Sequence, residues 1–111
     1  MGREMADETK ADLVAACRAA LRIPDDCTSY NDEIADLMSA ARSALVAGGV
    51  SRAMAESNDD ASVRVALKTY VKANFGMDNP DAELLMRSFT EMLCRMAGST
   101  EHGASGEAGS K

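Results

Sequence analysis

The sequence predicts an all-α protein: a small four-helix bundle-like domain with a loop between helices 2 and 3 and a disordered C-terminal tail. Three observations lead to this prediction. Apolar residues recur at helical spacing, no segment alternates with the period of two that is typical of a strand, and Gly and Pro separate the periodic segments. The 111 residues fit one domain. We expect the helical domain over residues 1–97 and the flexible Gly/Ser-rich tail over residues 98–111.

The first helix is expected from about Asp7 to Arg22. Its apolar residues share one face at helical spacing: Leu13, Ala16, Cys17 and Ala20. Pro24 ends this helix, because proline disfavours helical geometry at the residue before it.

The second helix is expected to start near Ser29, with Thr28 or Ser29 as its cap. It has the clearest amphipathic pattern of the chain, with an apolar stripe made by Tyr30, Ile34, Leu37, Met38, Ala41 and Leu45. The pair Gly48-Gly49 ends it. The following loop, residues 50–58, is less polar than an ordinary loop and fits either a short helical turn or a packed loop.

The third helix is expected to begin at a cap formed by Asn58 or Asp59 and to end at Gly76. Its buried stripe would be Val63, Ala66, Leu67, Tyr70, Val71 and Asn74. Asn79 and Pro80 open the fourth helix, because Asn is a favoured cap and Pro a favoured first helical residue. The stripe of this helix would be Ala82, Leu85, Met86, Phe89, Met92, Leu93 and Met96.

Two features of these helices are left over once a monomeric core has been assigned. The first feature is charge: the third helix carries a basic strip with i, i+4 spacing, Arg64, Lys68 and Lys72, and the outer side of the second helix carries two carboxylates, Asp32 and Asp36. The second feature is a pair of apolar residues, Val65 and Leu84, that lie opposite the buried stripes of their own helices. One interpretation is solvated charge with isolated exposed apolar residues, which are common on protein surfaces. The other is a subunit interface in which the basic strip meets the acidic one, formed by Arg64, Val65, Lys68, Lys72, Asp32, Asp36 and Leu84.

The sequence offers little for catalysis, cofactor binding or metal binding. No Gly-rich phosphate loop follows a strand. The only histidine, His102, lies in the expected tail, so we expect no Ser-His-Asp set and no general base. Three scattered cysteines, Cys17, Cys27 and Cys94, form neither a disulfide framework nor a zinc ligand set. We therefore expect no enzyme activity, no cofactor, no catalytic residue and no metal site.

The net charge of −6 argues against a freestanding nucleic-acid binder, which normally carries a basic patch. No apolar run approaches the roughly 18 residues of a transmembrane helix, and no signal peptide is visible, so we expect no membrane contact.

The stretch Val63–Gly76, followed by Asp78-Asn79-Pro80, then Phe89 and Met92-Leu93, resembles the head–tail connector (adaptor) family of long-tailed phages and prophages. The similarity covers roughly Leu13 to Met96, and its most distinctive part is the run from Tyr70 to Pro80. The long Gly/Ser-rich C-terminus departs from the family pattern.

The resemblance implies a structural protein of the virion head–tail interface, assembled in the host bacterial cytoplasm. It implies a homo-oligomeric ring, dodecameric on the portal protein, that extends the DNA channel and docks stopper or tail-completion proteins. DNA would pass through without specific binding, and the acidic charge suits a channel wall from which DNA slides.

The alternative is a small acidic helical binding or regulatory module, of helix-turn-helix or antitoxin-like type. The third and fourth helices are joined by a short Gly-containing turn, as in a helix-turn-helix. However, the recognition helix would begin with Asp81 and Glu83 at the end that meets DNA, and these carboxylates would repel phosphate.

Overall fold

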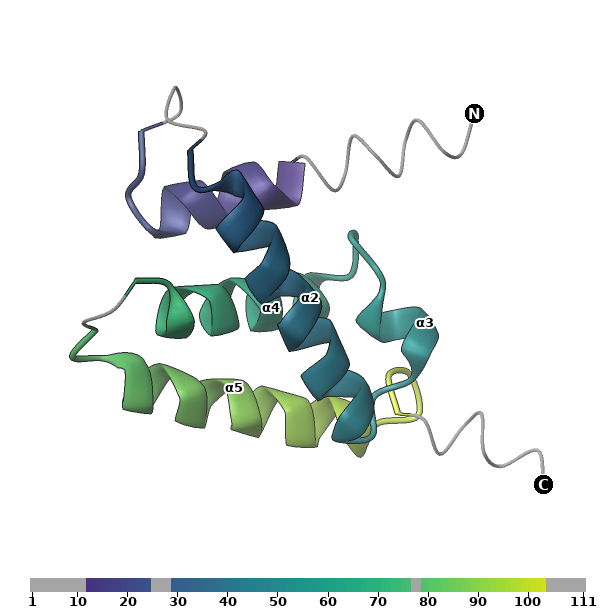
Figure 1. The fold of residues 1–111 in the computed structure, drawn as a ribbon. Coiled ribbons are helices and arrows are strands. Elements are labelled where there is room, and N and C mark those ends of the chain that lie inside the picture. The colour runs from purple at the N-terminus through teal and green to yellow at the C-terminus, as the bar shows by residue number, and fades with distance from the viewer. Residues whose placement is uncertain (1–11, 25–28, 77–78, 104–111) are drawn as a thin grey trace, which may run out of the picture.

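The computed structural model describes residues 12–24, 29–76 and 79–103. Within these ranges the chain is helical over residues 12–20 and then forms α2 (Asn31–Ala47), α3 (Arg52–Ala55), α4 (Ala61–Asn74) and α5 (Ala82–Ala97), and its only β-type pairing is a single bridge (Figure 1). The all-α prediction is confirmed. A few expected features lie outside the described residues: the helix start at Asp7, the alternative cap Thr28, Cys27, and Asp78 of the family-like run.

The helices are arranged around α4. Figure 1 shows α4 and α5 as an antiparallel pair, with α2 running steeply across them and the helix of residues 12–20 lying near the start of α2. The pair α4–α5 makes the most extensive helix–helix contact, followed by α2–α4. Arg18 fastens the first helix to α2, because its Nη1 donates to Asn31 Oδ1 over 2.8 Å.

The core forms where the first helix, α2 and α4 meet. Its fully buried side chains come mainly from the predicted stripes: Leu13, Cys17, Ile34, Met38, Ala41, Leu45, Val63, Ala66, Leu67 and Val71. The Tyr70 and Phe89 rings meet edge to face at 5.0 Å, which joins α5 to this core. Two predicted stripe residues, Tyr30 and Asn74, are exposed instead, because each lies at a helix end where the chain turns away from the core.

Three helices begin later than the sequence suggested. α2 begins at Asn31, and Tyr30, which forms no side-chain cap hydrogen bond, takes the cap position expected for Ser29. Asp60, rather than Asn58 or Asp59, caps α4, since its Oδ2 accepts from the Val63 backbone N–H at 3.0 Å. Asn79 Oδ1 accepts from the backbone N–H of Asp81 at 2.9 Å, and this turn delays the start of α5 until Ala82. At α4 the error is a choice among neighbouring residues that all have cap chemistry, whereas the cap residue of α5, Asp81, forms no side-chain cap hydrogen bond.

The segment between α2 and α4 contains a short helical turn, which is one of the two forms expected for residues 50–58. Ser51 caps α3 by accepting from the Met54 backbone N–H at 3.2 Å. Gly48, at the end of α2, allows a close approach to α5, because a Cβ there would lie 2.3 Å from a methyl carbon of Leu93.

The chain after α5 differs from the flexible tail expected from residue 98. Ser51 donates its backbone N–H to the carbonyl of His102 at 2.7 Å, and Val50 and Gly103 form the isolated β-bridge. His102 is only 8% exposed. Ordered structure therefore continues past Gly98 to Gly103, whereas residues 104–111 lie outside the described part.

Candidate subunit interface

The seven residues proposed from the sequence as an interface lie on three helices. Asp32 and Asp36 are exposed in the first half of α2, and Leu84 is 60% exposed near the start of α5. The remaining four belong to α4. These four residues were expected together on one outer side of the helix, and the structure divides them.

Arg64 contacts the first helix instead of facing open solvent. The side chain of Arg64 is only 24% exposed, lies 3.7 Å from Asp12 Oδ2, and donates from Nη1 to the Asn58 carbonyl at 2.8 Å. Lys68 is half-buried. A row of residues at i, i+4, i+8 drifts around a helix of 3.6 residues per turn, so only its last member, Lys72, is fully exposed. The expectation that the whole strip faces outward is wrong for Arg64.

Two positive charges of this strip, Arg64 and Lys68, act on the buried thiol of Cys17. Burial raises the pKa of Cys17 to about 11, although the charges of Lys68, Arg64 and Arg42 act in the opposite direction. Cys17 therefore stays protonated at neutral pH and acts as a small apolar core residue, as the sequence suggested.

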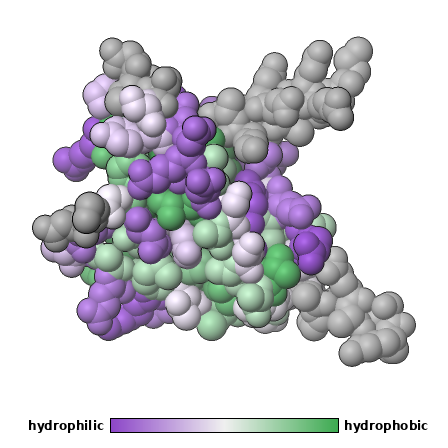
Figure 2. Space-filling view, viewed as in Figure 1, coloured by the Kyte–Doolittle hydropathy of each residue, from purple (hydrophilic) through white to green (hydrophobic). Residues whose placement is uncertain are grey.

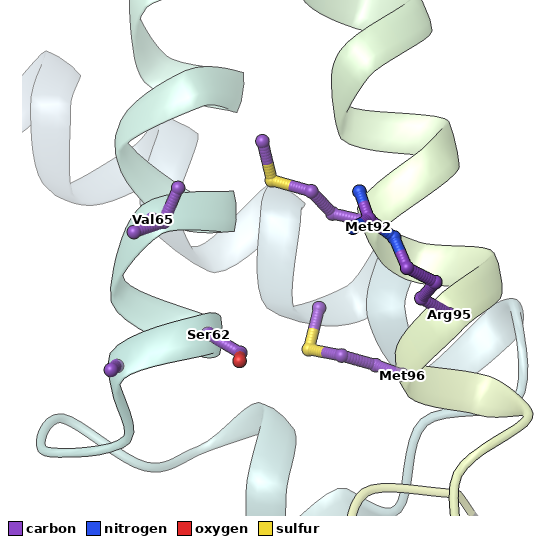
Figure 3. Close-up of a pocket in the computed structure, with 6 residues that line it drawn as sticks. Ser62, Val65, Met92, Arg95 and Met96 are labelled. Carbon is purple, nitrogen blue, oxygen red and sulfur yellow. The ribbon is translucent and has the colours of Figure 1, made fainter.

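Val65 lies on a groove between α4 and α5. The groove has a volume of about 380 Å³ and is lined by Ala61, Ser62 and Val65 from α4 and by Met92, Arg95 and Met96 from α5. Figure 3 shows the Met92 and Met96 side chains extending from α5 toward α4, across from Ser62 and Val65. Val65 is 46% exposed. Flexible thioether side chains on the walls suit a surface that adapts to a partner.

The apolar face of α5 is incompletely covered. Of its predicted stripe, only Phe89 and Met96 are buried, whereas Ala82, Leu85, Met86, Met92 and Leu93 are half-buried. Figure 2 shows pale green, apolar residues over much of the region that α5 occupies in Figure 1. Val65 of α4, which lines the groove, and exposed Leu84 of α5 lie outside the buried stripes and add further apolar surface that a partner could cover.

Arg42 has a structural role that was not predicted from the sequence. Its Nη1 donates to the carbonyls of Ala55 and Ser57 at 2.8 and 2.9 Å, and Nη2 donates to Asn58 Oδ1. Burial lowers the pKa of Arg42, in part offset by the charge of Glu56. This arginine holds the α3 segment against α2. One feature of the sequence could have indicated this role. Arg42 directly follows buried Ala41, so it lies at the edge of the buried face of α2, where a long side chain can reach the following loop.

A second arrangement that the sequence analysis missed joins Ser99, His102 and Asp60. His102 Nε2 lies 3.0 Å from Asp60 Oδ2, and Nδ1 lies 3.3 Å from Ser99 Oγ. Burial alone would raise the pKa of Asp60, but hydrogen bonds from Val63 and His102 outweigh it and hold this pKa below its usual value. The only sequence signal was a lone histidine in a Gly/Ser-rich segment.

These three residue types are those of a hydrolase triad, contrary to the expectation that no such set could form. Their roles are nevertheless different, because the carboxylate contacts Nε2 and the serine contacts Nδ1, the reverse of the hydrolase order. The Ser99 hydroxyl also donates to the Met96 carbonyl at 2.9 Å and accepts from the His102 backbone N–H at 2.9 Å. The hydroxyl is thus engaged in shaping the turn rather than prepared for nucleophilic attack.

None of the helices in the described part of the chain combines the length and apolar composition needed to cross a bilayer. A family model described as "Phage connector protein" matches residues 13–103. No curated protein and no solved structure matches the chain. The family match runs from the first helix to the turn that ends at Gly103, and so includes the ordered residues after α5. The chain belongs to the phage connector protein family.

Proposed function

We propose that the protein assembles as a ring beneath the portal of a long-tailed phage, extends the DNA channel, and receives a stopper or tail-completion protein. Family membership supports the coarser statement, a structural connector role in the phage particle. The dodecameric ring, the portal contact, the tail-side partner and assembly in the host bacterial cytoplasm are the finer parts of the proposal.

The observation that carries the ring is the incompletely covered apolar face of α5, with the adjoining groove at Val65. Apolar surface left in water favours association, since burial removes it from solvent. In a closed ring each subunit presents two different faces to its two neighbours. The α5 side would be one of these faces, with Val65 and Leu84 as its apolar contacts.

The other face would be the acidic side of α2. Asp32 and Asp36 are exposed one helical turn apart, and we propose that they meet Lys72 of the neighbouring subunit. Such charge pairs set register and partner choice more than raw affinity. Arg64 and Lys68 contribute less, because their side chains are already engaged or half-buried within the subunit.

The net charge of −6 supports passage of DNA without binding. Non-specific affinity for DNA comes from Lys and Arg side chains that neutralise phosphates and release counterions, and an acidic channel wall offers no such contacts. We propose that acidic residues dominate the channel lining. A map of the assembled ring with a lumen dominated by Lys and Arg would overturn this part.

The test is assembly with the portal protein of the same phage, followed by light scattering and electron microscopy. The portal is included because a ring that nucleates on it would be missed with the protein alone. Wild type should add a ring to the portal, whereas Val65→Glu and Leu84→Ser should weaken or abolish the ring while remaining helical and folded. Ala53→Glu, on the exposed side of α3, is the matched control and should assemble normally.

A wild-type chain that fails to associate with the portal would contradict the ring proposal. Normal assembly of Val65→Glu would contradict only the choice of face. The helix-turn-helix alternative gains no support from the geometry, since α4 and α5 lie side by side along their length rather than crossing steeply (Figure 1).

A further inference from the structure

Three side chains with metal-ligating atoms meet at the start of α4. Asp60 is the α4 cap, whereas Glu101 and His102 belong to the turn after α5. One carboxylate oxygen of each acid and one ring nitrogen of His102 all lie within 4.8 Å of one another. Asp60 directly precedes Ala61, which lines the groove at Val65, but the cluster shares no residue with that groove and is not used by the proposed function.

The turn that carries His102 is held in place before any ligand arrives. His102 donates its backbone N–H to Ser99 Oγ, its carbonyl accepts from Ser51, and Gly103 donates to the Ser99 carbonyl at 2.9 Å. Only glycine fits at position 103, because a Cβ would lie 2.4 Å from the Ala97 carbonyl oxygen. A preorganised turn lowers the cost of ordering the ligands on binding.

Both ring nitrogens of His102 have a polar neighbour. Nε2 lies 3.0 Å from Asp60 Oδ2, and Nδ1 lies 3.3 Å from Ser99 Oγ. In the metal-free chain an Nε2–H donates to the Asp60 carboxylate. A metal ion that displaced this proton would find Nε2 and one oxygen each of Asp60 and Glu101 within 4.8 Å of one another, and Nδ1–H would then donate to Ser99 Oγ.

We propose that Asp60, Glu101 and His102 bind a divalent transition-metal ion of the Zn²⁺ class, through His102 Nε2 and one oxygen of each carboxylate. One nitrogen and two oxygen donors suit such an ion, and water would complete the coordination. Ligand bonds of about 2.0–2.2 Å place neighbouring donors roughly 3–3.5 Å apart, close to the separation of Nε2 and Oδ2. Ser99 would act as the outer partner that orients the imidazole.

The bound ion would tie the C-terminal turn to the α4 cap. The ion would bind only the folded chain with this geometry, so it would raise the stability of the domain by mass action. The affinity should be modest, because the chain supplies three ligands and Glu101 is exposed.

The test is calorimetric titration of ZnCl₂ into the full chain carrying Cys27→Ser and Cys94→Ser, which removes competing thiols. We expect binding of one ion per chain, with a higher melting temperature in zinc than in a chelator. In this background Glu101→Gln should weaken binding by roughly tenfold or more without changing the melting temperature of the metal-free protein. The matched control Glu91→Gln, an exposed carboxylate of α5, should bind as the background does.

His102→Gln should abolish binding, and it should also lower metal-free stability because it removes the hydrogen bond to Asp60. The Glu101 variant separates the two roles, since Glu101 makes no such bond in the described structure. The proposal is overturned if the background chain binds no zinc, or if Glu101→Gln and His102→Gln bind as tightly as the background. In those cases a proton alone joins His102 to Asp60.

Discussion

The helices α2 and α5 both carry an apolar stripe but lie in different environments. Contrary to the sequence-based expectation, α5 is the more strongly amphipathic of the two, yet its stripe is the less buried. The α2 stripe is buried over Ile34, Met38, Ala41 and Leu45, because α2 is covered by the first helix, α3 and α4. The α5 stripe packs mainly on α4, and only Phe89 and Met96 are buried. Apolar periodicity thus predicts which face of a helix is kept from water. How much of that face is buried within the subunit depends on how many other helices pack against it.

The reactivity of two cysteines, one in each region, should give the largest measurable difference between the two regions. Cys17 is buried in the core with its pKa raised to about 11 by burial, whereas Cys94 is exposed on α5. We expect an alkylating reagent at pH 8 to modify Cys94 readily and Cys17 slower by roughly 10³-fold or more, because Cys17 reacts only after unfolding. Peptide mass spectrometry over time checks this. Equal rates would show that the first helix does not cover the core in solution.

Truncation of one stripe residue in each helix should separate the two regions by stability. Ile34→Ala should lower the free energy of unfolding by about 2–5 kcal/mol, because it leaves a cavity in a fully buried site. Met92→Ala, on the half-buried stripe of α5, should cost at most about 1.5 kcal/mol. Urea denaturation followed by circular dichroism measures both. A Met92→Ala cost as large as that of Ile34→Ala would mean that α5 is covered within the monomer.

A substitution at Gly48 tests the close approach between the end of α2 and Leu93 of α5. A Cβ at this position meets the end of the Leu93 side chain at 2.3–2.9 Å, so Gly48→Ala would force Leu93 out of its present rotamer and should destabilise by about 0.5–1.5 kcal/mol. Gly98→Ala is the matched control, since its Cβ would come no closer than 3.4 Å to any atom and its φ is −85°. We expect the control to change stability by less than about 0.5 kcal/mol. Thermal denaturation compares them, and equal effects would contradict a close approach of α2 to α5.

Local sequence information was sufficient for the helices and most of the core. The 3.6-residue repeat identified the buried residues of α2 and α4, because a helix hides one continuous face whatever covers it. Caps were placed less accurately: Asn58, Asp59 and Asp60 all have cap chemistry, and only the backbone geometry selects Asp60. The family-like run from Tyr70 to Pro80 pointed to the connector family, and the match over residues 13–103 confirms it.

The candidate sites were predicted less completely. The spacing of Arg64, Lys68 and Lys72 predicted one outward basic strip, but no local rule shows that Arg64 contacts Asp12 of the first helix. The cluster of Asp60, Glu101 and His102 joins residues about 40 positions apart in the sequence, as the 42-residue separation of Asp60 and His102 illustrates. A histidine between Glu and Gly in a polar segment carries no signal of burial.

The sequence by itself determined which segments are helical, which faces avoid water, and which family the chain resembles. Each of these depends on interactions between residues a few positions apart or on a contiguous motif. Only the tertiary structure decided that Arg64 is engaged inside the subunit, that α5 stays half-covered, and that the segment after Gly98 folds back onto α4. These features depend on contacts between segments that are far apart in the sequence. Such contacts are decided by how the helices pack together, and no local sequence pattern specifies them.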